Sequence, residues 1–379
     1  MRIAFDSGPL KSGHAVRGVG FYTSEILNAL SRERSGLERL IIDDFDFLTN
    51  AKLLNSGRYD LIHSSFFNPY FLTVPIKYRG KLIVTVHDLI YLLYPKHYPP
   101  GIKGRINFLI QKLLIKRASA IITDTETTKK DIVRLLGINE SKIKVAYLAA
   151  KNVFKPLKDR NKLARIKKEF GLSKKFVLYV GDVNYNKNIP VLVKACDIAR
   201  VPLVIVGKHA SEIERNLKTD LKAIKGPRDW LRFLLNRPHP EKAHYKMLLD
   251  EINKNPSVKR LGFVSDEDLN CIYNLATVYC QPSLYEGFGL PVLEAMASGT
   301  PVVISKTQAL VEIAHDAALI ADPDSPEDFA EKIKNLVDSD KLREEFIKRG
   351  FKVSETYTWQ KTAKATLAVY LNVIKNPNT

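Results

Sequence analysis

Residues 278–305 read VYCQPSLYEGFGLPVLEAMASGTPVVIS, and this one stretch predicts a strand, a glycine-bearing loop, a helix and a second strand. The first apolar run ends at Pro282, Pro291 suits the first turn of a helix, and Gly299 suits the end of that helix. Strands that alternate with helices in this way form parallel sheets from β-α-β units. The stretch therefore predicts an α/β fold.

The same alternation continues along the chain in two series. Short apolar runs rich in β-branched residues read RIAFDS, DLIHSS, KLIVTVHDL, AIITDT and IKVAYLA, followed by KFVLYVGDV, PLVIVG, VKRLGFV, VYCQPS and PVVIS. Between the two series, residues 151–175 are strongly charged, so we place a domain boundary near Pro156. We expect two doubly wound domains, residues 1–155 and residues 156–359, with ligands beyond the carboxyl ends of the strands.

Length and composition agree with two globular domains. The chain has 379 residues, of which 45% are hydrophobic and 26% charged. We expect a soluble protein, because no apolar run approaches the roughly 18–20 residues of a membrane span and the start MRIAFDSG has no secretory core. The three cysteines, Cys196, Cys271 and Cys280, match neither a zinc site nor a redox pair, so we expect buried thiols in a reducing cytoplasm.

The chain is unusually basic, with a formal net charge of +18. Residues 1–155 contain 24 Lys and Arg against 13 Asp and Glu, so the excess is concentrated there. Such a charge predicts attraction to nucleic acid, to anionic lipid or to phosphorylated substrates.

Two glutamates in the opening stretch are candidates for ligand binding. Gly287, Gly289 and Pro291 separate Glu286 from Glu294, so the first lies on a loop and the second is expected in the first helical turn. Glycines let backbone N–H groups approach a ligand, and a helix start favours negative charge, which suits a diphosphate. A carboxylate can also accept hydrogen bonds from sugar or ribose hydroxyls. The competing interpretation is a plain strand-turn-helix in which the glutamates only cap and solvate.

The segment EGFGLPVLEA, residues 286–295, resembles the signature of glycosyltransferase family 4, whose two glutamates bracket a nucleotide-sugar donor. The resemblance covers nearly the whole chain and continues, in order, through RGVGFYTSEILNAL, VTVHDLIYLLYP, YVGDVNYNKNIPVLVKA, GFVSDEDLNCIYNLA and ASGTPVVIS. It implies the GT-B fold, with two Rossmann-like domains facing a central cleft and a last helix, residues 360–379, that returns to the first domain. The family generally retains anomeric configuration and needs no metal, so no cofactor is expected.

The resemblance also implies roles for individual residues. It places His87 beside the sugar ring, Lys187 at the leaving phosphate and Glu286 at the hydroxyls of the transferred sugar, and it implies that these three are the catalytic residues. The residues expected to bind the donor are Gly18, Gly20, Lys187, Val264, Glu286, Gly287, Phe288, Gly289, Leu290 and Glu294. The alternatives are a structural histidine, a solvated loop lysine, and glycines that only allow a helix start to pack.

The chain departs from the family pattern at the second phosphate cation. Many members have arginine directly after the equivalent of Gly181, where this chain has Asp182. Some relatives instead have arginine just before the lysine, where this chain has Asn186. The second cation is therefore unassigned, which also leaves open a non-catalytic protein with the same fold.

The family's front-face reaction implies no protein base, because a phosphate oxygen takes the proton. The pair Glu286 and Glu294 is then not expected to act as the opposed carboxylates of a glycosidase. The acidic triplets at residues 44–46 and 322–324 resemble metal-binding pairs of other sugar transferases, but such short patterns arise often by chance.

Two basic segments are candidates for contact with a membrane or an acceptor. A helix is expected over residues 102–118, with an apolar stripe at Ile102, Ile106, Leu109, Leu113 and Leu114, and with Arg105, Lys112 and Lys116 on another face. The alternative is a surface helix that packs on its own domain. The second candidate segment lies between Gly207 and Lys259 and includes Trp230 and Arg232.

The function implied by the resemblance is retaining transfer of a hexose, mannose first and glucose next, from a nucleotide diphosphate sugar to a glycan or lipid-linked acceptor. Relatives with similar HDLIYLLYP segments include mannosyltransferases, which favours GDP-mannose, and the enzyme is expected in the cytoplasm or peripherally on the cytoplasmic membrane face. A nucleic-acid-binding protein is the alternative from another class, but the chain has no recognisable nucleic-acid module.

Overall fold

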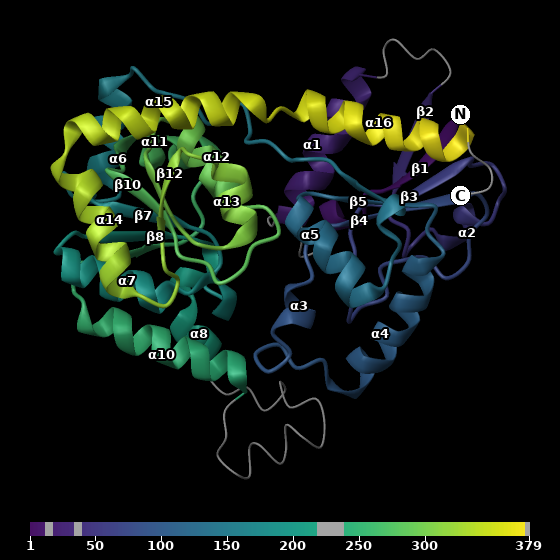
Figure 1. Ribbon diagram of the computed structural model, residues 1–379, viewed down its shortest axis with the longest axis horizontal. Helices are drawn as coiled ribbons and strands as arrows, with labels where there is room; N and C mark the ends of the chain where they lie inside the picture. Colours follow the sequence, from purple (N-terminus) through teal and green to yellow (C-terminus); the bar gives the residue numbers. More distant parts are fainter. Residues whose placement is uncertain (12–17, 34–39, 218–238, 376–379) are drawn as a thin grey trace. The chain divides into compact units, whose positions relative to one another are not determined.

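A computed structural model describes residues 1–11, 18–33, 40–217 and 239–375 (Figure 1). The described chain divides into two compact units. Unit 1 comprises residues 1–95, 99–149 and 357–379, and unit 2 comprises residues 96–98 and 150–356. The first division falls a few residues before the expected boundary near Pro156, and residues 357–359 belong with unit 1.

Unit 1 is built on a parallel sheet in the order β2-β1-β3-β4-β5-β6. Its strands are β1 (Arg2–Asp6), β2 (Ile41–Phe45), β3 (Leu61–Ser64), β4 (Lys81–Val86), β5 (Ala120–Thr123) and β6 (Ile143–Val145). Its helices are α1 (Gly18–Glu33), α2 (Ala51–Leu54), α3 (Ile90–Leu93), α4 (Gly101–Lys116), α5 (Glu126–Asp131) and α16 (Trp359–Lys375). A short π-helix over Ile132–Leu136 continues α5, and 3-10 turns cover Gly8–Lys11 and Glu140–Lys142.

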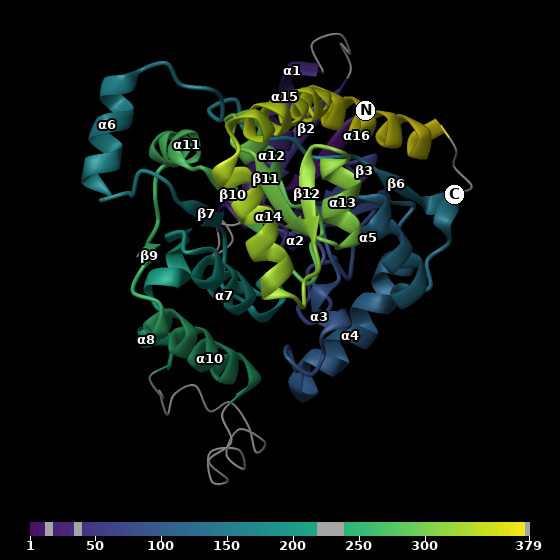
Figure 2. The same ribbon diagram turned by 60° about the vertical axis from the view of Figure 1, so that its left-hand side comes forward.

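Unit 2 has a second parallel sheet, in the order β12-β11-β10-β7-β8-β9. Its strands are β7 (Val177–Val180), β8 (Leu203–Val206), β9 (Val258–Leu261), β10 (Val278–Gln281), β11 (Val302–Ser305) and β12 (Ala318–Ala321). Its helices are α6 (Arg160–Glu169), α7 (Ile189–Ala199), α8 (Ile213–Leu217), α10 (Pro240–Lys254), α11 (Asp266–Leu275), α12 (Leu290–Ala297), α13 (Gln308–Ala314), α14 (Pro326–Asp338) and α15 (Asp340–Thr356). Its 3-10 turns cover Tyr185–Lys187 and Lys208–Ser211, and α6 packs beside α11 (Figure 2).

The predicted α/β fold is confirmed, and all ten expected runs contain strands. The central strands are continuous apolar runs, such as LVIV in β8, because helices cover both faces of a parallel sheet. Two edge strands were not predicted. β2 reads IIDDF and β12 reads ALIA, and neither has the continuous β-branched pattern of a central strand.

Candidate functional site

The candidate site of unit 2 lies where the chain order of its sheet reverses. The chain builds β7, β8 and β9 in one direction and then places β10 on the other side of β7. In open parallel sheets, ligands bind beyond the carboxyl ends of the strands at such a switch point. The loops after β7 and β10 are therefore the expected ligand-binding loops of this unit, and they carry Lys187 and Glu286.

Lys187 and Glu286 form an ion pair across these two loops. The Lys187 Nζ lies 2.7 Å from Glu286 Oε1 and 2.8 Å from Oε2. Glu286 Oε1 also accepts hydrogen bonds from Gln281 Nε2 at 2.8 Å and from Ser283 Oγ at 2.6 Å. Glu286 is only 6% exposed, so its charge is held by three donors in a buried position. The simple alternative of a solvated loop lysine is wrong for Lys187.

Two asparagines fix the loop that carries Lys187. Asn188 has a left-handed backbone, with φ of 55°, and its side-chain amide donates to the carbonyls of Pro282 at 3.1 Å and Pro323 at 2.7 Å. Asn186 is buried, and its side-chain amide donates to the Tyr285 carbonyl at 3.2 Å. Asn186 thus connects the two loops and supplies no cation to the site.

Asp182 also has a defined partner. Its Oδ1 lies 2.8 Å from His209 Nδ1, and its carbonyl accepts a hydrogen bond from the Tyr179 hydroxyl at 2.6 Å. His209 belongs to the 3-10 turn after β8, so the pair joins the loops that follow two neighbouring strands. A histidine therefore lies beside the position at which many family members have arginine.

The glycine loop leads directly into α12. Gly289 has φ of +103°, and a Cβ atom there would lie 2.6 Å from Leu310 Cδ2, so the loop requires glycine at this position. Leu290 begins α12 and Pro291 stands in its first turn, as expected. Phe288 is buried beside this turn. The partial positive charge of the helix start is thus directed toward the Glu286 loop.

Glu294 lies in the second turn of α12, so its expected place in the first turn is wrong. The Tyr273 hydroxyl donates to Glu294 Oε2 at 3.0 Å. Burial raises the pKa of Glu294 to about 7, although the hydrogen bond from Tyr273 opposes the shift. Val264 lies on a different loop, between β9 and the Ser265 cap of α11.

The histidine candidate of unit 1 lies at the carboxyl ends of β4 and β5. His87 follows β4, and its Nδ1 lies 2.7 Å from Oδ2 of Asp124, which follows β5. Burial lowers the pKa of His87, but the charge and hydrogen bond of Asp124, together with the charge of Asp88 and the Ser65 carbonyl, raise the pKa above its ordinary value. Asp124 was not among the predicted site residues, although it directly follows the apolar run AIIT.

Further contacts fix the ring of His87. Its Nε2 lies 3.2 Å from the Ser65 carbonyl, and the Tyr22 ring meets it edge-on at 4.5 Å between centroids. Tyr22 lies on α1, which begins at Gly18 and has Gly20 buried in its first turn. The helix that begins with the expected glycines therefore contacts His87 through Tyr22.

The basic candidates divide into three groups. Arg105 and Lys116 are exposed on α4, but the Lys112 ammonium donates to the Leu135 carbonyl at 3.1 Å and so helps to hold α4 on its unit. Of the expected apolar stripe, only Leu114 is buried. Trp230 and Arg232 lie outside the described residues.

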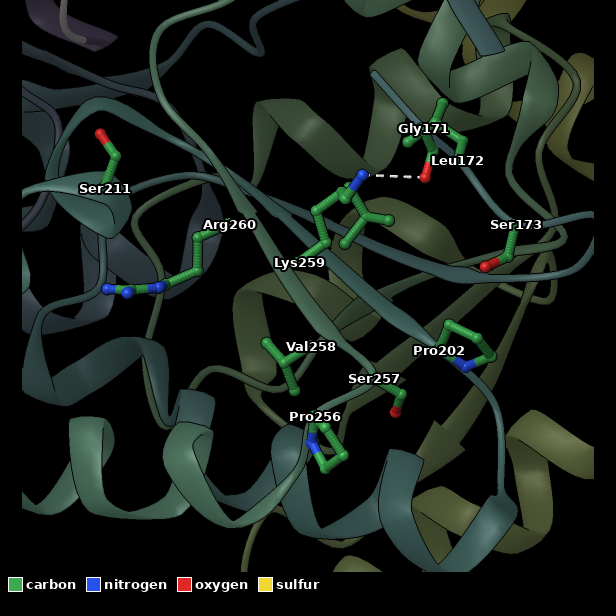
Figure 3. A pocket seen from close by; sticks show the side chains of 11 residues that line it. Gly171, Leu172, Ser173, Pro202, Ser211, Pro256, Ser257, Val258, Lys259 and Arg260 are labelled. Carbon is green, nitrogen blue, oxygen red and sulfur yellow. Dashed lines mark hydrogen bonds between the residues drawn. The ribbon is translucent and has the colours of Figure 1, made fainter. Parts of the chain in front are cut away.

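A groove of about 600 Å³ in unit 2 lies away from the switch-point loops (Figure 3). Its lining runs along the edge strand β9, from Pro202 and Ser257, which precede β8 and β9, to Ser211 in the turn after β8. Its cations are already paired. Lys259 donates to the carbonyls of Phe170 and Gly171, and Arg260 pairs with Glu214. The groove therefore lies apart from the switch-point loops that carry Lys187 and Glu286.

The acidic triplets at residues 44–46 and 322–324 take part in local turns. Asp46 and Asp322 accept hydrogen bonds from nearby backbone N–H groups and so hold local turns. Within the described ranges, no three His, Cys, Asp or Glu side chains gather as they would around a metal ion. No described helix is both long and apolar enough to cross a bilayer.

Comparison with known proteins identifies the family. Residues 161–353, more than half of the chain, match the model of glycosyl transferases group 1, and residues 16–149 match the model of glycosyltransferase family 4. An O-antigen chain mannosyltransferase B of Escherichia coli is 25% identical over 98% of this chain and 99% of its own length.

Solved structures match in fold. Sucrose-phosphate synthase from Thermosynechococcus elongatus has a TM-score of 0.71 at 19% identity, covering 99% of both chains. HepE of Anabaena, in complex with UDP and glucose, has a TM-score of 0.70 at 18% identity, covering 98% of this chain and 99% of its own. The matched family models and the two Rossmann-like sheets show that this chain belongs to the group 1 glycosyl transferases of glycosyltransferase family 4, with the GT-B fold.

Proposed function

We propose that this glycosyltransferase moves a hexose, mannose in first place and glucose in second, from a nucleotide diphosphate sugar to a glycan or lipid-linked acceptor. The full-length similarity to an O-antigen chain mannosyltransferase supports mannose, and with it GDP-mannose as the donor. The Anabaena structure with UDP and glucose supports a nucleotide diphosphate sugar of the same general kind.

The Lys187–Glu286 ion pair at the switch point is the main support for this function. As the bond between the anomeric carbon and the diphosphate oxygen breaks, negative charge grows on the leaving phosphate. A fixed ammonium stabilises that charge more than it stabilises the intact donor, which accelerates the reaction. The start of α12, directly after the Glu286 loop, adds a partial positive charge on the same phosphates.

The proposed reaction proceeds on one face of the sugar. The acceptor oxygen forms the new bond to the anomeric carbon on the side from which the diphosphate leaves, and its proton passes to a phosphate oxygen. The configuration is retained, and no protein carboxylate is needed as a base. Glu286, held by Gln281, Ser283 and Lys187, then orients sugar hydroxyls instead of taking a proton.

Glu294 and His87 receive supporting roles. A carboxylate on α12 can accept hydrogen bonds from both hydroxyls of a ribose, so we assign Glu294 to the nucleoside. His87, oriented by Asp124, is assigned to the hydroxyls of the transferred sugar. Charge on the diphosphate is met by Lys187 and α12 in this proposal, so transfer is expected to persist in excess chelator.

A panel of donors tests the proposal. We expect GDP-mannose to raise the melting temperature of the full chain more than UDP-glucose or the free sugars do, because a ligand of the folded state stabilises it. The product from GDP-mannose should keep the anomeric configuration of the donor, read from the coupling of its anomeric proton. If no GDP or UDP sugar binds, the proposal is wrong.

A matched pair of variants tests the role proposed for Lys187. Lys187→Ala should lower kcat about 10²–10³-fold, the usual effect of removing one charge-stabilising donor. Lys194→Ala, which changes an exposed lysine on α7, should leave kcat unchanged. Donor binding without any transfer by the wild-type chain would instead favour the non-catalytic alternative.

A further inference from the structure

The strand β10 has two chemically different faces. Val278 and Cys280 belong to the apolar core of unit 2. Tyr279 and Gln281 alternate with them along the strand and therefore lie on the opposite face, where both are buried. A glutamine amide buried in a central strand is unfavourable unless its donors and its acceptor all have partners. The partners of Gln281 therefore show what this polar face does.

Both ends of the Gln281 amide are hydrogen-bonded. Its Nε2 donates to Glu286 Oε1 at 2.8 Å and to Ser283 Oγ at 2.8 Å, and its Oε1 accepts a hydrogen bond from the Tyr279 hydroxyl. Because an ionised carboxylate only accepts, Gln281 must direct its nitrogen toward Glu286 and its oxygen toward a donor, which Tyr279 supplies. The hydrogen bonds therefore run in one direction, from Tyr279 through Gln281 to Glu286. We call Tyr279 and Gln281 the β10 relay.

The two oxygens of Glu286 are held differently. Oε1 accepts hydrogen bonds from Gln281, from Ser283 Oγ at 2.6 Å and from Lys187 Nζ at 2.7 Å. Within the part of the chain that the structure describes, Oε2 accepts only from Lys187, at 2.8 Å. A carboxylate oxygen accepts about two hydrogen bonds. Oε1 therefore has no room for a ligand hydroxyl, whereas Oε2 has room for one.

The backbone that carries Glu286 is fixed by contacts outside the β10 relay. The Ser305 hydroxyl, at the end of β11, donates to the Ser283 carbonyl at 2.5 Å. The Leu284 N–H donates to the Asn186 carbonyl at 2.8 Å. Neither bond involves Tyr279 or Gln281, so we expect both to remain when the relay is interrupted. A change in the relay then affects the orientation of the carboxylate and leaves the loop in place.

We propose that Tyr279 and Gln281 are positioning residues, which orient Glu286 so that its Oε2 accepts a hydrogen bond from a single hydroxyl of the transferred sugar. Because Oε1 is occupied, the carboxylate does not bind two neighbouring hydroxyls with its two oxygens. The relay orders the carboxylate before the donor arrives, which lowers the entropic cost of binding. The inference rests on the proposed function, since it takes the ligand of Glu286 to be the sugar of the donor.

Tyr279→Phe in the full chain tests the relay, because it removes one hydroxyl and keeps the ring. We expect the affinity for GDP-mannose to fall about tenfold, the effect of losing roughly one hydrogen bond. The affinity for GDP, which lacks the sugar, should not change. Isothermal titration calorimetry measures both, with UDP-glucose and UDP as the second pair. Tyr59→Phe, near the amino end of β3 in unit 1, is the control and should leave all four affinities unchanged. Equal weakening of the nucleotide and the nucleotide sugar by Tyr279→Phe would overturn the proposal.

A second variant interrupts the relay one step closer to Glu286. Gln281→Met keeps the length of the side chain but has no amide, so it should cause the same selective loss of GDP-mannose affinity, and it serves alone if Tyr279→Phe does not fold. In the double variant the loss should be no greater than in Gln281→Met, because Tyr279 acts only through Gln281. Additive losses would show that Tyr279 acts by another route and would overturn the proposal.

Donor analogues that lack one hydroxyl of the hexose at a time identify the contact. One analogue should bind Tyr279→Phe as tightly as it binds the wild-type chain, because the hydroxyl that Oε2 accepts is missing from it. Equal weakening of every analogue by Tyr279→Phe would overturn the proposal and leave the proposed function standing. A wild-type chain that binds neither GDP-mannose nor UDP-glucose would contradict the proposed function, and this inference with it.

Discussion

The Glu286 carboxylate accepts hydrogen bonds from other side chains besides Lys187, so its buried charge does not depend on the lysine alone. Gln281 and Ser283 both donate to Glu286 Oε1. In the proposed reaction these two donors stay on the carboxylate while Lys187 also meets a phosphate. The buried charge then keeps two hydrogen bonds, and only the contribution of the ammonium to Glu286 changes.

The first prediction uses this pair as a double-mutant cycle. Lys187→Met should lower the free energy of unfolding by about 1–3 kcal/mol, because buried Glu286 loses its charged donor. Adding Glu286→Gln should restore much of the loss, since a neutral amide needs no cation. Urea unfolding at pH 7.5 measures both, and Lys194→Met is the control. Additive effects of the two changes would show that the pair does not couple.

The second prediction concerns Glu294 and pH. Its pKa of about 7 lies above the ordinary value of 4.5, so the folded state holds a proton that the unfolded state releases. Stability is therefore lost as pH rises from about 4.5 to about 7. Glu294→Gln stays neutral and should raise the melting temperature at pH 8, but have little effect at pH 4.5.

The same variant should weaken donor binding if Glu294 holds the ribose. If Glu294→Gln raises the melting temperature and weakens donor binding, the Glu294 carboxylate lowers the stability of the fold but contributes to donor binding. Tyr273→Phe removes the hydroxyl that donates to Glu294 and serves as a comparison. An equal change in melting temperature for Glu294→Gln at both pH values would contradict the raised pKa.

The third prediction concerns the orientation of His87. In Asp124→Asn, the burial that lowers the pKa of His87 remains, and of the groups that raise it only Asp88 and the Ser65 carbonyl are left. The pKa of His87 should therefore fall, which NMR titration of the imidazole carbons measures. Asp44→Asn, on the distant strand β2, is the control. An unchanged titration would mean that Asp124 does not set the charge of His87.

At the scale of elements, α16 is fixed to unit 1 by buried polar contacts. The Tyr370 hydroxyl lies 2.5 Å from His63 Nδ1, and Thr362 Oγ1 donates to the Tyr147 carbonyl at 2.6 Å. Thr85 Oγ1 lies 2.8 Å from the other nitrogen of His63. Burial lowers the pKa of His63 to about 3, so the ring is neutral and needs one donor and one acceptor.

The fourth prediction follows from that network. Tyr370→Phe should lower the free energy of unfolding by about 1–3 kcal/mol, because one buried nitrogen of His63 loses its partner. The effect should be the same from pH 5 to pH 8, since His63 does not titrate there. Ala368→Ser changes an exposed position on the same helix and should have little effect. A loss that varies with pH would contradict a neutral His63.

Elements with strong patterns were predictable from the sequence, and edge elements were not. Central strands carry continuous apolar runs because both faces are covered, whereas β2 carries two aspartates and β12 two alanines. The sequence pattern predicted the apolar stripe of α4, but it did not predict whether that stripe is buried or exposed. Periodicity separates two faces of a helix, and only the partners of Asn107 and Gln111 decide which face is buried.

The residues of the candidate site could be predicted from the sequence, but most of their contacts could not. Lys187, Glu286 and His87 follow strands, where the fold places ligands, and the family pattern assigns them. Their partners depend on strand order. Glu286 stands 99 residues after Lys187, and they meet only because β10 lies next to β7. Asp124 meets His87 for the same reason, because β4 lies next to β5.

At the scale of the whole molecule, the net charge of +18 dominates long-range behaviour. The fifth prediction is that duplex DNA binds weakly and without sequence preference. Affinity measured by fluorescence anisotropy should fall at least about 100-fold between 50 mM and 200 mM salt, because binding depends on counterion release. Binding of a neutral-sugar acceptor should change far less. Sequence-dependent affinity that persists at 200 mM salt would favour the nucleic-acid alternative.

The amides on the inner face of α4 have a consequence for the uniqueness of the native state. An apolar residue in place of Gln111 would give this helix two faces that both prefer burial, and the energy gap between its two rotational settings would shrink. The native amides separate these settings, because only one of them satisfies the backbone of residues 70–74. Unit 1 thus leaves apolar side chains of α4 exposed, and the buried amides favour one rotational setting of this helix over the other.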